Sequence, residues 1–475
     1  MMTSTRSPEP DRGHHWYWCE WAWTGRGGNP VEGGVTIGVD THGRIVSVVA
    51  GTTATAEVER LPGVTLAGFA NSHSHAFHRA LRGRTHGNGG SFWTWREQMY
   101  RVAERLTPES YYRLARGVYA EMALAGVTAV GEFHYLHHGP DGTPYSDPNV
   151  MGSALVAAAA DAGIRITVLD TCYLAGGLSS RGGPLPLAGP QARFGDGDSA
   201  TWAARVDGFR PDSPHARVGA GVHSVRAVPA DQIPTVAEWA RRRDAPLHVH
   251  VSEQPAENEA CGAAYGLSPT RVLERAGALG NRTSLVHATH LDDGDITAVR
   301  SSGSAVCLCP TTERDLADGL PRLHDLTAGD AEDPPAVLTV GTDQHAQVDM
   351  FEEMRGVELH ERLRSGRRGT LAPAALHDAA GAAGHVRLGW GGVATPEAGI
   401  LRPGARADLV TVSLDSIRLS GFDPEHAAGA LVYAATAADI RHVMADGRWI
   451  VRDGAHVRVP DTADALDAAI KEVLT

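Results

Sequence analysis

The stretch Thr65-Leu-Ala-Gly-Phe-Ala-Asn-Ser-His73-Ser-His75 is the part of this chain that decides its fold. Its apolar, β-prone half predicts a strand over Thr65–Asn71, and two histidines follow where that strand should end. Alternation along a strand puts both rings on one face, so a single His-x-His is weak evidence for a site. Three more β-prone runs end in metal-binding side chains, which makes the pattern a much stronger signal. These ends are His248-Val-His250-Val-Ser-Glu253, His287-Ala-Thr-His290 and Asp343-Gln-His345.

Short apolar runs alternate with Ala-rich helical stretches through the middle of the chain, which predicts an α/β fold. The expected strands are Thr65–Asn71, Thr128–Phe133, Arg165–Asp170, Arg217–Val222, Pro246–Val251, Thr283–Ala288, Ser304–Cys309 and Ala336–Gly341. Helices between successive strands imply a parallel sheet, and eight parallel strands are the number that closes a TIM-type (β/α)8 barrel. The alternative is an open doubly wound sheet. That topology ordinarily carries a Gly-rich phosphate loop after its first strand, where this chain has His-Ser-His.

The two ends of the chain are β-rich and differ in style from the middle. We therefore predict residues 1–61 as the N-terminal part of a small β-sandwich domain and residues 62–388 as a metal-dependent barrel. Residues 389–475 are predicted to complete the small domain and to end in a helix over Thr462–Thr475. The segment Gly176–Ser199 is rich in Gly and Pro and too long for an ordinary connection, which indicates a functional lid or an interface loop.

Composition argues against several classes of function. The 475 residues carry a net charge of -13, so a nucleic-acid-binding surface is not expected. The first ten residues contain no apolar signal region, and no apolar run is long enough to span a bilayer, so no membrane association is expected. Five cysteines without a Cys-x-x-Cys pair indicate a reduced, cytoplasmic protein rather than a disulfide scaffold. Cys307-Leu-Cys309 could form a thiolate pair, but its apolar setting favours a buried strand.

The carboxyl ends of barrel strands face one shared site, so the polar residues at these ends are candidates for function. They are His73, His75, Glu132, His134, Tyr135, His223, Arg226, His250, Glu253, His287, His290, Thr312, Glu313, Asp343 and His345. Any one of them could be an ordinary buried polar residue with a partner, but one barrel would then carry many at a single end. Neutral imidazoles and a carboxylate suit Zn²⁺ or Fe²⁺ with a position left for water, which indicates metal-assisted hydrolysis.

These strand ends resemble the amidohydrolase superfamily, in its mononuclear deaminase branch. In that branch a His-x-His on strand one, a His on strand five and an Asp on strand eight hold the metal. The resemblance implies that His73, His75, His250 and Asp343 bind one divalent metal ion, with Zn²⁺ expected and Fe²⁺ as the alternative. His250 is preferred over His248 because the branch carries His-x-x-Glu, which the chain matches at residues 250–253.

Longer blocks resemble the formimidoylglutamate deiminases within that superfamily. They are His-Ser-His-Ala-Phe at 73–77, Ser-Phe-Trp-Thr-Trp-Arg-Glu-Gln-Met-Tyr at 91–100, Glu-Phe-His-Tyr-Leu-His-His at 132–138, Val-His-Ser-Val-Arg-Ala-Val at 222–228, Leu-Val-His-Ala-Thr-His at 285–290 and Cys-Pro-Thr-Thr-Glu at 309–313. The resemblance implies hydrolysis of N-formimidoyl-L-glutamate to N-formyl-L-glutamate and ammonia, a reaction of histidine degradation. It also implies a homodimer.

The same resemblance implies which residues bind the substrate, a small dicarboxylate. Arg96 and Arg226 match the positions for its two carboxylates, which suit planar bidentate donors. Tyr135 and His223 are the implied hydrogen-bonding partners. His78 stands where a family member carries Gln, at a position expected to lie near the substrate.

Three residues are expected to carry the chemistry. Asp343 would accept a proton from the attacking water, and His287 would hydrogen-bond the oxygen as the tetrahedral centre forms. Glu253 would relay protons to the leaving nitrogen. Its alternative role is that of a carboxylate that only orients a histidine ligand.

Other functions are weighed beside this one. A deaminase of a purine, pterin or related heterocycle would need an aromatic slot rather than two arginines, and another formimidoyl or guanidino compound is a further possible substrate. A metal-binding or scaffold protein with a decayed site would lack a ligand or a proton shuttle, and neither is missing from this sequence.

Overall fold

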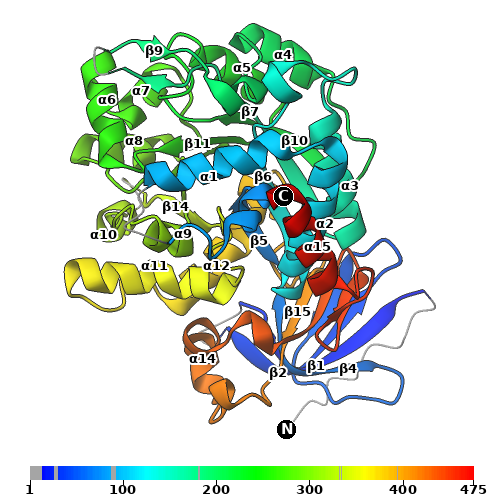
Figure 1. Ribbon diagram of the computed structural model, residues 1–475. Helices are drawn as coiled ribbons and strands as arrows, with labels where there is room; N and C mark the ends of the chain where they lie inside the picture. The colour runs from blue at the N-terminus through cyan, green and yellow to red at the C-terminus, as the bar shows by residue number, and fades with distance from the viewer. Residues whose placement is uncertain are drawn as a thin grey trace.

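The computed structural model describes residues 13–25, 30–86, 92–179, 182–330, 332, 334–392 and 394–475. The first ten residues, whose sequence predicts no signal region, lie outside the described part. Figure 1 shows a barrel with helices around it and, below it, a sheet that contains both the early blue and the late orange and red strands.

The barrel is an eight-stranded parallel sheet, as the sequence predicts. In order around the sheet its strands are β5 (Phe69–Ser74), β6 (Val127–His134), β7 (Arg165–Cys172), β10 (Ala216–Val222), β11 (Leu247–Val251), β12 (Thr283–His287), β13 (Ala305–Leu308) and β14 (Val337–Val340). The sheet closes where the last strand meets the first. There the backbone N–H of Asp343 donates to the carbonyl of His73 (3.0 Å), and the N–H of His75 donates to the carbonyl of Asp343 (3.1 Å).

Helices connect the strands and cover the outside of the barrel (Figure 1). They are α1 (Phe92–Arg105), α2 (Pro108–Leu124), α3 (Val150–Ala162), α4 (Ser199–Asp207), α5 (Ile233–Arg242), α6 (Pro255–Tyr265), α7 (Pro269–Arg275), α8 (Asp293–Ser302), α9 (Pro310–Asp315), α10 (Leu323–Thr327), α11 (Met350–Ser365), α12 (Pro373–Ala380) and α13 (Ala382–Arg387). Local signals fix several of their ends. Thr107 and Ser110 form a capping box at the start of α2, and Gly163, with φ of 78°, ends α3 in the left-handed conformation that glycine favours.

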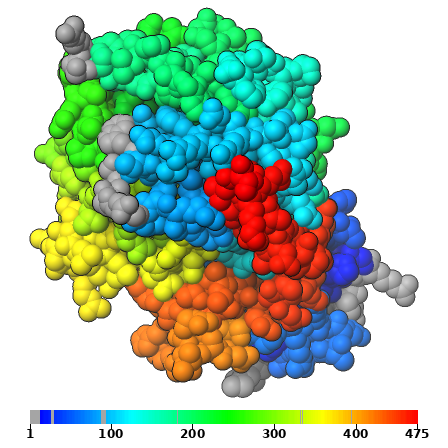
Figure 2. Space-filling model, in the orientation of Figure 1, coloured from blue at the N-terminus to red at the C-terminus, as the bar shows by residue number. Residues whose placement is uncertain are grey.

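The second sheet is built from both ends of the chain, as predicted. Its strands, in order, are β18 (Ala455–His456), β17 (Arg448–Arg452), β16 (Ile440–Ala445), β15 (Leu409–Val412), β4 (Glu59–Ala67), β1 (His15–Trp23), β2 (Val31–Val39) and β3 (Ile45–Val49). Beside it lies α14 (Ala427–Ala434). The chain ends in α15 (Thr462–Leu474), which packs against α2 of the barrel, and an ion pair joins Arg113 to Glu472. Figure 2 shows these red C-terminal residues lying on the blue and cyan surface of the barrel.

The expected strand Thr65–Asn71 is wrong in one respect, because it is two strands in two different sheets. β4 pairs with β1 and β15 in the terminal sheet, whereas β5 pairs with β6 in the barrel. Gly68 separates them, and a Cβ at this position would lie 2.4 Å from Oγ1 of Thr128. The residues on both sides of Gly68 are buried, so the apolar pattern continues across the junction and Gly68 is the only local mark of the change.

The segment after β7 forms a small hairpin and a turn of 3-10 helix. The hairpin pairs β8 (Gly177–Leu178) with β9 (Pro184–Leu185), and the 3-10 turn η3 spans Gly189–Arg193. All five cysteines are buried and unpaired, Cys307 and Cys309 among them. Within the described ranges, no helix is both long and apolar enough to cross a membrane.

Candidate active site

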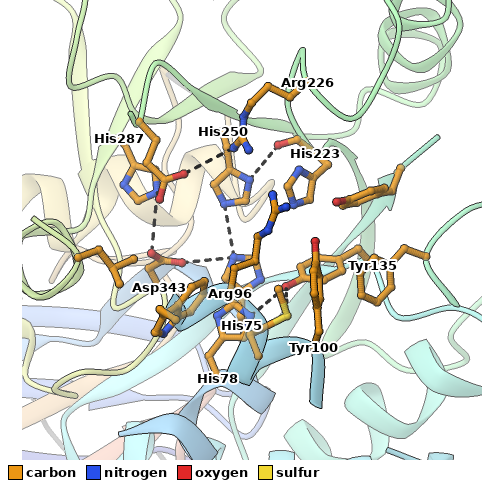
Figure 3. Close-up of a pocket in the computed structure, with 16 residues that line it drawn as sticks. His75, His78, Arg96, Tyr100, Tyr135, His223, Arg226, His250, His287 and Asp343 are labelled. Atoms are coloured by element: carbon orange, nitrogen blue, oxygen red, sulfur yellow. Dashed lines mark hydrogen bonds and ion pairs between the residues drawn. The ribbon is translucent and has the colours of Figure 1, made fainter. Parts of the chain in front are cut away.

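A pocket lies at the carboxyl ends of the barrel strands (Figure 3). Its lining residues are His75, His78, Trp95, Arg96, Met99, Tyr100, Tyr135, Tyr173, Phe194, His223, Arg226, His250, Glu253, His287, Leu316 and Asp343. The structure thus brings together every residue for which the sequence predicts a catalytic or substrate-binding role. The expected ligand His73 is completely buried and lies beneath the pocket, in contact with His75 and His250.

Four side chains at the floor of this pocket form what we call the cradle: His73, His75, His250 and Asp343. One ligand atom of each lies within 4.8 Å of the others. The Nε2 atom of His73 is 3.1 Å from that of His75 and 3.1 Å from that of His250, and the last two are 3.4 Å apart. Oδ1 of Asp343 is 3.4 Å from His73 Nε2 and 3.3 Å from His75 Nε2.

The Nδ1 atoms of His75 and His250 show that the close approach of the Nε2 atoms is not due to hydrogen bonding between these two rings. Nδ1 of His75 donates to the carbonyl of Phe133 (3.0 Å), and Nδ1 of His250 donates to the carbonyl of His223 (2.9 Å). A neutral ring whose Nδ1 is protonated has only a lone pair at Nε2, so these two Nε2 atoms cannot hydrogen-bond each other. Ligand atoms around a tetrahedral metal ion, at about 2.0–2.1 Å from it, are about 3.3–3.4 Å apart. The cradle therefore fits a divalent metal ion.

Charge in the cradle is also suited to a cation. Burial lowers the pKa of His73 to about 4 and holds the pKa of His250 well below its ordinary value, so both rings are neutral. Burial alone would raise the pKa of Asp343, but its contacts with His73 and His75 outweigh burial and hold that pKa well below its usual range. Neutral imidazoles beside an ionised carboxylate are the protonation states that metal ligation requires.

Beside the cradle lies a chain of titratable groups. Nε2 of His287 is 3.6 Å from Oε1 of Glu253 and 3.8 Å from Oδ2 of Asp343, and its Nδ1 is 3.4 Å from Oε1 of Glu313. Burial alone would lower the pKa of His287, but the three carboxylates outweigh it and raise that pKa well above its ordinary value. Burial raises the pKa of Glu253. Glu313, which the sequence places at a strand end without a role, is the group that fixes the His287 ring.

Backbone strain marks two of these positions. His287 has φ of 69° and Asp343 has φ of 44°, in the left-handed region that residues with a Cβ rarely adopt. Such conformations cost of order 1–3 kcal/mol each and persist where the surrounding structure enforces them. Here they occur where β12 ends and just after β14, and they turn the side chains into the shared pocket.

The two predicted substrate-binding arginines come from different elements (Figure 3). Arg96 lies on α1, and its Cζ is 5.4 Å from the centre of the Tyr100 ring. Arg226 follows β10, and its side chain is 15% exposed. Nη2 of Arg226 is 3.8 Å from Oε2 of Glu253, and its Nε is 3.8 Å from Oε2 of Glu257.

The other three residues predicted to bind substrate, His78, Tyr135 and His223, contact one another or neighbouring side chains of the pocket. Nε2 of His78 and the hydroxyl of Tyr135 are 2.9 Å apart, and the His78 ring lies 4.4 Å from the His75 ring, centre to centre. The hydroxyl of Tyr135 also contacts the sulfur of Met99 at 3.8 Å. His223 places its ring 4.4 Å from that of Tyr173 and holds His250 through its carbonyl.

Sequence reasoning missed the aromatic wall of the pocket. Trp95 and Tyr100 belong to the block at 91–100, which is described from Phe92 onward, and Tyr100 follows Arg96 by four residues on one helix face. That spacing is a usable signal. Tyr173 lies just beyond β7, and Phe194 lies in the Gly/Pro-rich segment, where no periodicity predicts burial.

Several strand-end candidates lie away from the pocket. Glu132 and His345 both hydrogen-bond Ser74 beneath it, at 2.6 and 3.1 Å. His290 is bound to the carbonyl of Asp318 (2.7 Å), and the Thr312 hydroxyl donates weakly to the carbonyl of Thr342 (3.4 Å). These residues support the site rather than line it.

His134 belongs to a second buried group, His134, His137 and Asp170, whose ligand-type atoms also lie within 4.8 Å of one another. Together with Arg205 we call it the Arg205 cluster. Arg205 donates to both oxygens of Asp170 (2.7 and 2.9 Å), and Nε2 of His137 donates to the carbonyl of Thr171 (2.9 Å). The carboxylate of Asp170 and Nε2 of His137 are thus already committed to partners, so the cation of this cluster is Arg205.

Comparisons with known proteins agree with this geometry. The model of the Amidohydrolase family matches residues 64–450. Formimidoylglutamate deiminase of Pseudomonas aeruginosa is 37% identical over 428 residues, which cover 88% of this chain and 91% of the relative. 8-oxoguanine deaminase of the same organism is 30% identical over 396 residues, covering 82% and 83% of the two chains. The crystal structure of an amidohydrolase from Brucella melitensis aligns with a TM-score of 0.85 and 32% identity, covering 97% of this chain and 100% of that one.

Proposed function

This chain belongs to the amidohydrolase family as a deaminase-type hydrolase of carbon–nitrogen bonds, and we propose that its substrate is N-formimidoyl-L-glutamate. The observation that carries the proposal is the presence of Arg96 and Arg226 in the pocket whose floor is the cradle. Two guanidinium forks suit a substrate with two carboxylates. The identity to the Pseudomonas aeruginosa enzyme supports the same substrate.

The cradle residues would hold one divalent ion, which we propose to be Zn²⁺, and such an ion lowers the pKa of water toward neutrality. Water attacks the formimidoyl carbon, and Asp343 accepts the proton that this water loses. His287, held cationic by its neighbouring carboxylates, donates to the oxygen on which charge develops.

Glu253 moves protons to the nitrogen that leaves. Its carboxylate lies beside His287 and next to Arg226. It therefore lies between the floor of the pocket and the residues that we call the substrate wall, which are Arg96, Tyr100, Tyr135, Tyr173, Phe194 and Arg226. As the carbon–nitrogen bond breaks, the nitrogen takes up a proton and departs as ammonia, and the carbon keeps the water oxygen as a formyl group. Glu257 accepts the backbone N–H of Glu253 (3.2 Å) and helps to set its place.

A second candidate function is deamination of a heterocycle, which the aromatic wall and the 30% identical 8-oxoguanine deaminase favour. The rings of the wall are tilted relative to one another, from 39° between Tyr135 and Tyr173 upward. Phe194 meets Tyr135 at 81° and Tyr173 at 63°. A flat base stacks best between nearly parallel faces, and these rings do not form such a slot.

Ammonia release from a panel of compounds tests the proposal. The panel contains N-formimidoyl-L-glutamate, its aspartate analogue, a guanidino analogue and several purines and pterins. We expect kcat/KM to be highest for N-formimidoyl-L-glutamate by at least about 100-fold, since a buried guanidinium left unpaired is costly. Faster turnover of a heterocycle would replace this proposal with the second candidate.

A further inference from the structure

We propose that Gln191 sets the hydroxyl of Tyr100 as a hydrogen-bond donor into the pocket, where it binds the substrate carboxylate that Arg96 also binds. This inference rests on the proposed function. It assigns Tyr100 as a substrate-binding residue and Gln191 as a positioning residue that acts through it. Neither is predicted from the sequence.

The amide of Gln191 has only one sensible orientation. Its Oε1 accepts the backbone N–H of Ala188 (3.1 Å), and its Nε2 faces the carbonyl of Gly176 (3.4 Å). Exchanging the two ends would set the amide nitrogen against an N–H and the amide oxygen against a carbonyl. Nε2 therefore donates to the two phenol oxygens beside it, those of Tyr100 (3.0 Å) and Tyr173 (3.0 Å).

A phenol oxygen that accepts a hydrogen bond must send its own proton elsewhere. Tyr173 also hydrogen-bonds the side chain of Tyr100, which uses one of the two hydroxyl protons. Burial and the hydrogen bond to Tyr100 both raise the pKa of Tyr173, which is the direction expected when the protonated Tyr173 hydroxyl donates that bond and Tyr100 accepts it. The remaining proton belongs to Tyr100, and among the described residues no acceptor is bonded to it.

The hydroxyl proton of Tyr100 lies near the guanidinium of Arg96. Tyr100 follows Arg96 by one turn of α1, and the guanidinium lies 5.4 Å from its ring centre. Figure 3 shows the Tyr100 hydroxyl and the Arg96 guanidinium on the same side of the pocket. A carboxylate has lone pairs for both donors, and a hydrogen bond from a neutral phenol adds selectivity without adding charge. The hydroxyl of Tyr135, the other phenol predicted to contact the substrate, has a different partner, Nε2 of His78 at 2.9 Å.

The segment that carries Gln191 is fixed to the helix that carries Tyr100. Arg193, which is only 1% exposed, donates to the backbone carbonyls of Glu104 (3.0 Å) and Leu106 (2.7 Å), at and just beyond the end of α1. Its Nε donates to the carbonyl of His138 (2.9 Å). The 3-10 turn η3 and α1 are therefore held as one unit, and the Gln191 amide is held in register with the Tyr100 phenol.

The test compares two substitutions in the pocket with the same two kinds of substitution outside it. Gln191→Glu replaces a donor by a carboxylate, which captures the Tyr100 proton and adds a like charge beside the substrate. We expect kcat/KM for N-formimidoyl-L-glutamate to fall by roughly 100-fold or more. Tyr100→Phe removes the donor and should lower it by about 10- to 100-fold, mainly through KM. Gln98→Glu on α1 and Tyr112→Phe on α2 lie outside the pocket and should change kcat/KM by less than about twofold.

Two further measurements separate positioning from a general structural effect. Gln191→Leu should lower kcat/KM by about three- to tenfold alone but by less than about twofold in a Tyr100→Phe background, because Gln191 acts through that phenol. Full losses in both backgrounds would overturn the inference. For a formimidoyl compound that lacks the carboxylate bound by Arg96, kcat/KM should be unchanged by Tyr100→Phe.

Failure of this inference is distinguishable from failure of the proposed function. If the wild-type enzyme does not release ammonia from N-formimidoyl-L-glutamate, the proposed function is wrong. If it does, and Tyr100→Phe with unchanged metal content matches Tyr112→Phe in KM, only the assignment of Tyr100 and Gln191 is wrong. Because Tyr100 is half-buried, its variant is expected to fold even if Gln191 variants do not.

Discussion

The cradle and the Arg205 cluster are two buried groups of histidine and aspartate that look alike as lists of residues and differ in chemistry. Both bring ligand-type atoms within 4.8 Å of one another. In the Arg205 cluster, Asp170 accepts two hydrogen bonds from Arg205 and a third from Trp202 Nε1 (3.0 Å). In the cradle, every ion pair of Asp343 among the described residues is with a histidine.

The difference shows where the positive charge comes from. Burial alone would raise the pKa of Asp170, but the guanidinium of Arg205 outweighs it and lowers that pKa, so the cluster is neutralised from within. The cradle has three histidine rings around its carboxylate, and two of these rings direct protonated Nδ1 atoms outward to carbonyls. A metal ion would supply the missing positive charge in the cradle. In the Arg205 cluster it would have to displace Arg205.

Among variants that keep the metal, the largest effect on activity is expected from Glu253→Gln, which keeps the shape and removes the titrating group. We expect kcat to fall by roughly two to four orders of magnitude while the metal content stays unchanged. Steady-state ammonia release and metal analysis of the same sample check this. An unchanged kcat would assign Glu253 to orienting a ligand, and a lost metal would extend the cradle beyond its four residues.

The next largest effect concerns the substrate wall above the cradle. Arg96→Ala and Arg226→Ala should each lower kcat/KM by roughly 30-fold to several thousand-fold, since loss of one partner of a charged pair costs about 2–5 kcal/mol. Lysine at either position should restore only part of this, because an ammonium cannot form the planar fork. Arg101→Ala, on an exposed face of α1, is the matched control.

If both alanine variants turn over N-formimidoyl-L-glutamate as the wild type does, the dicarboxylate assignment is wrong. The heterocycle deaminase would then become the leading candidate. A substrate without one carboxylate adds a finer test, since it should lose little more on removal of the arginine that normally meets the missing group.

Substitution in the Arg205 cluster should affect stability rather than chemistry. Arg205→Met leaves Asp170 and Asp196 buried without their cation, and we expect the free energy of unfolding to fall by about 3–5 kcal/mol. Urea denaturation measures this loss. The folded variant should keep its metal and change kcat by less than about threefold. Loss of the metal would break the distinction between the two clusters.

The smallest effect is expected at Glu257, a buried carboxylate that Arg226 approaches only at 3.8 Å. Burial raises its pKa to about 7, from 4.5. The folded protein therefore binds an extra proton between these values, so the stability that this group contributes is present below pH 4.5 and lost as the pH rises through about 7. Glu257→Gln cannot ionise and should lose about 1–3 kcal/mol less than the wild type between about pH 5 and about pH 8. Equal losses in both proteins would contradict the raised pKa.

The sequence predicts the barrel and the cradle well because both depend on periodic features. Alternation sets which side chains share a strand face, and strand ends of a parallel barrel meet at one edge. That logic fails at Gly68, where two buried strands of different sheets follow one another without a change of pattern. It also fails for His134, the last residue of β6, where strand alternation no longer fixes the direction of a side chain.

The substrate wall is harder to predict because irregular segments build much of it. Phe194 and Gln191 come from a Gly/Pro-rich stretch whose position depends on Arg193 and on backbone carbonyls of α1. Such hydrogen bonds leave no spacing in the sequence. Arg96 and Tyr100, four residues apart on one helix, are the part of the wall that periodicity could have found.

Metal analysis of three purified proteins tests the central claim most directly. We predict about one equivalent of divalent metal per chain in the wild type and in Arg205→Met, and almost none in His75→Asn, with ammonia release lost in the same variant. Two equivalents in the wild type, metal retained in His75→Asn, or metal lost with Arg205 would each contradict the assignment of the cradle as the single metal site.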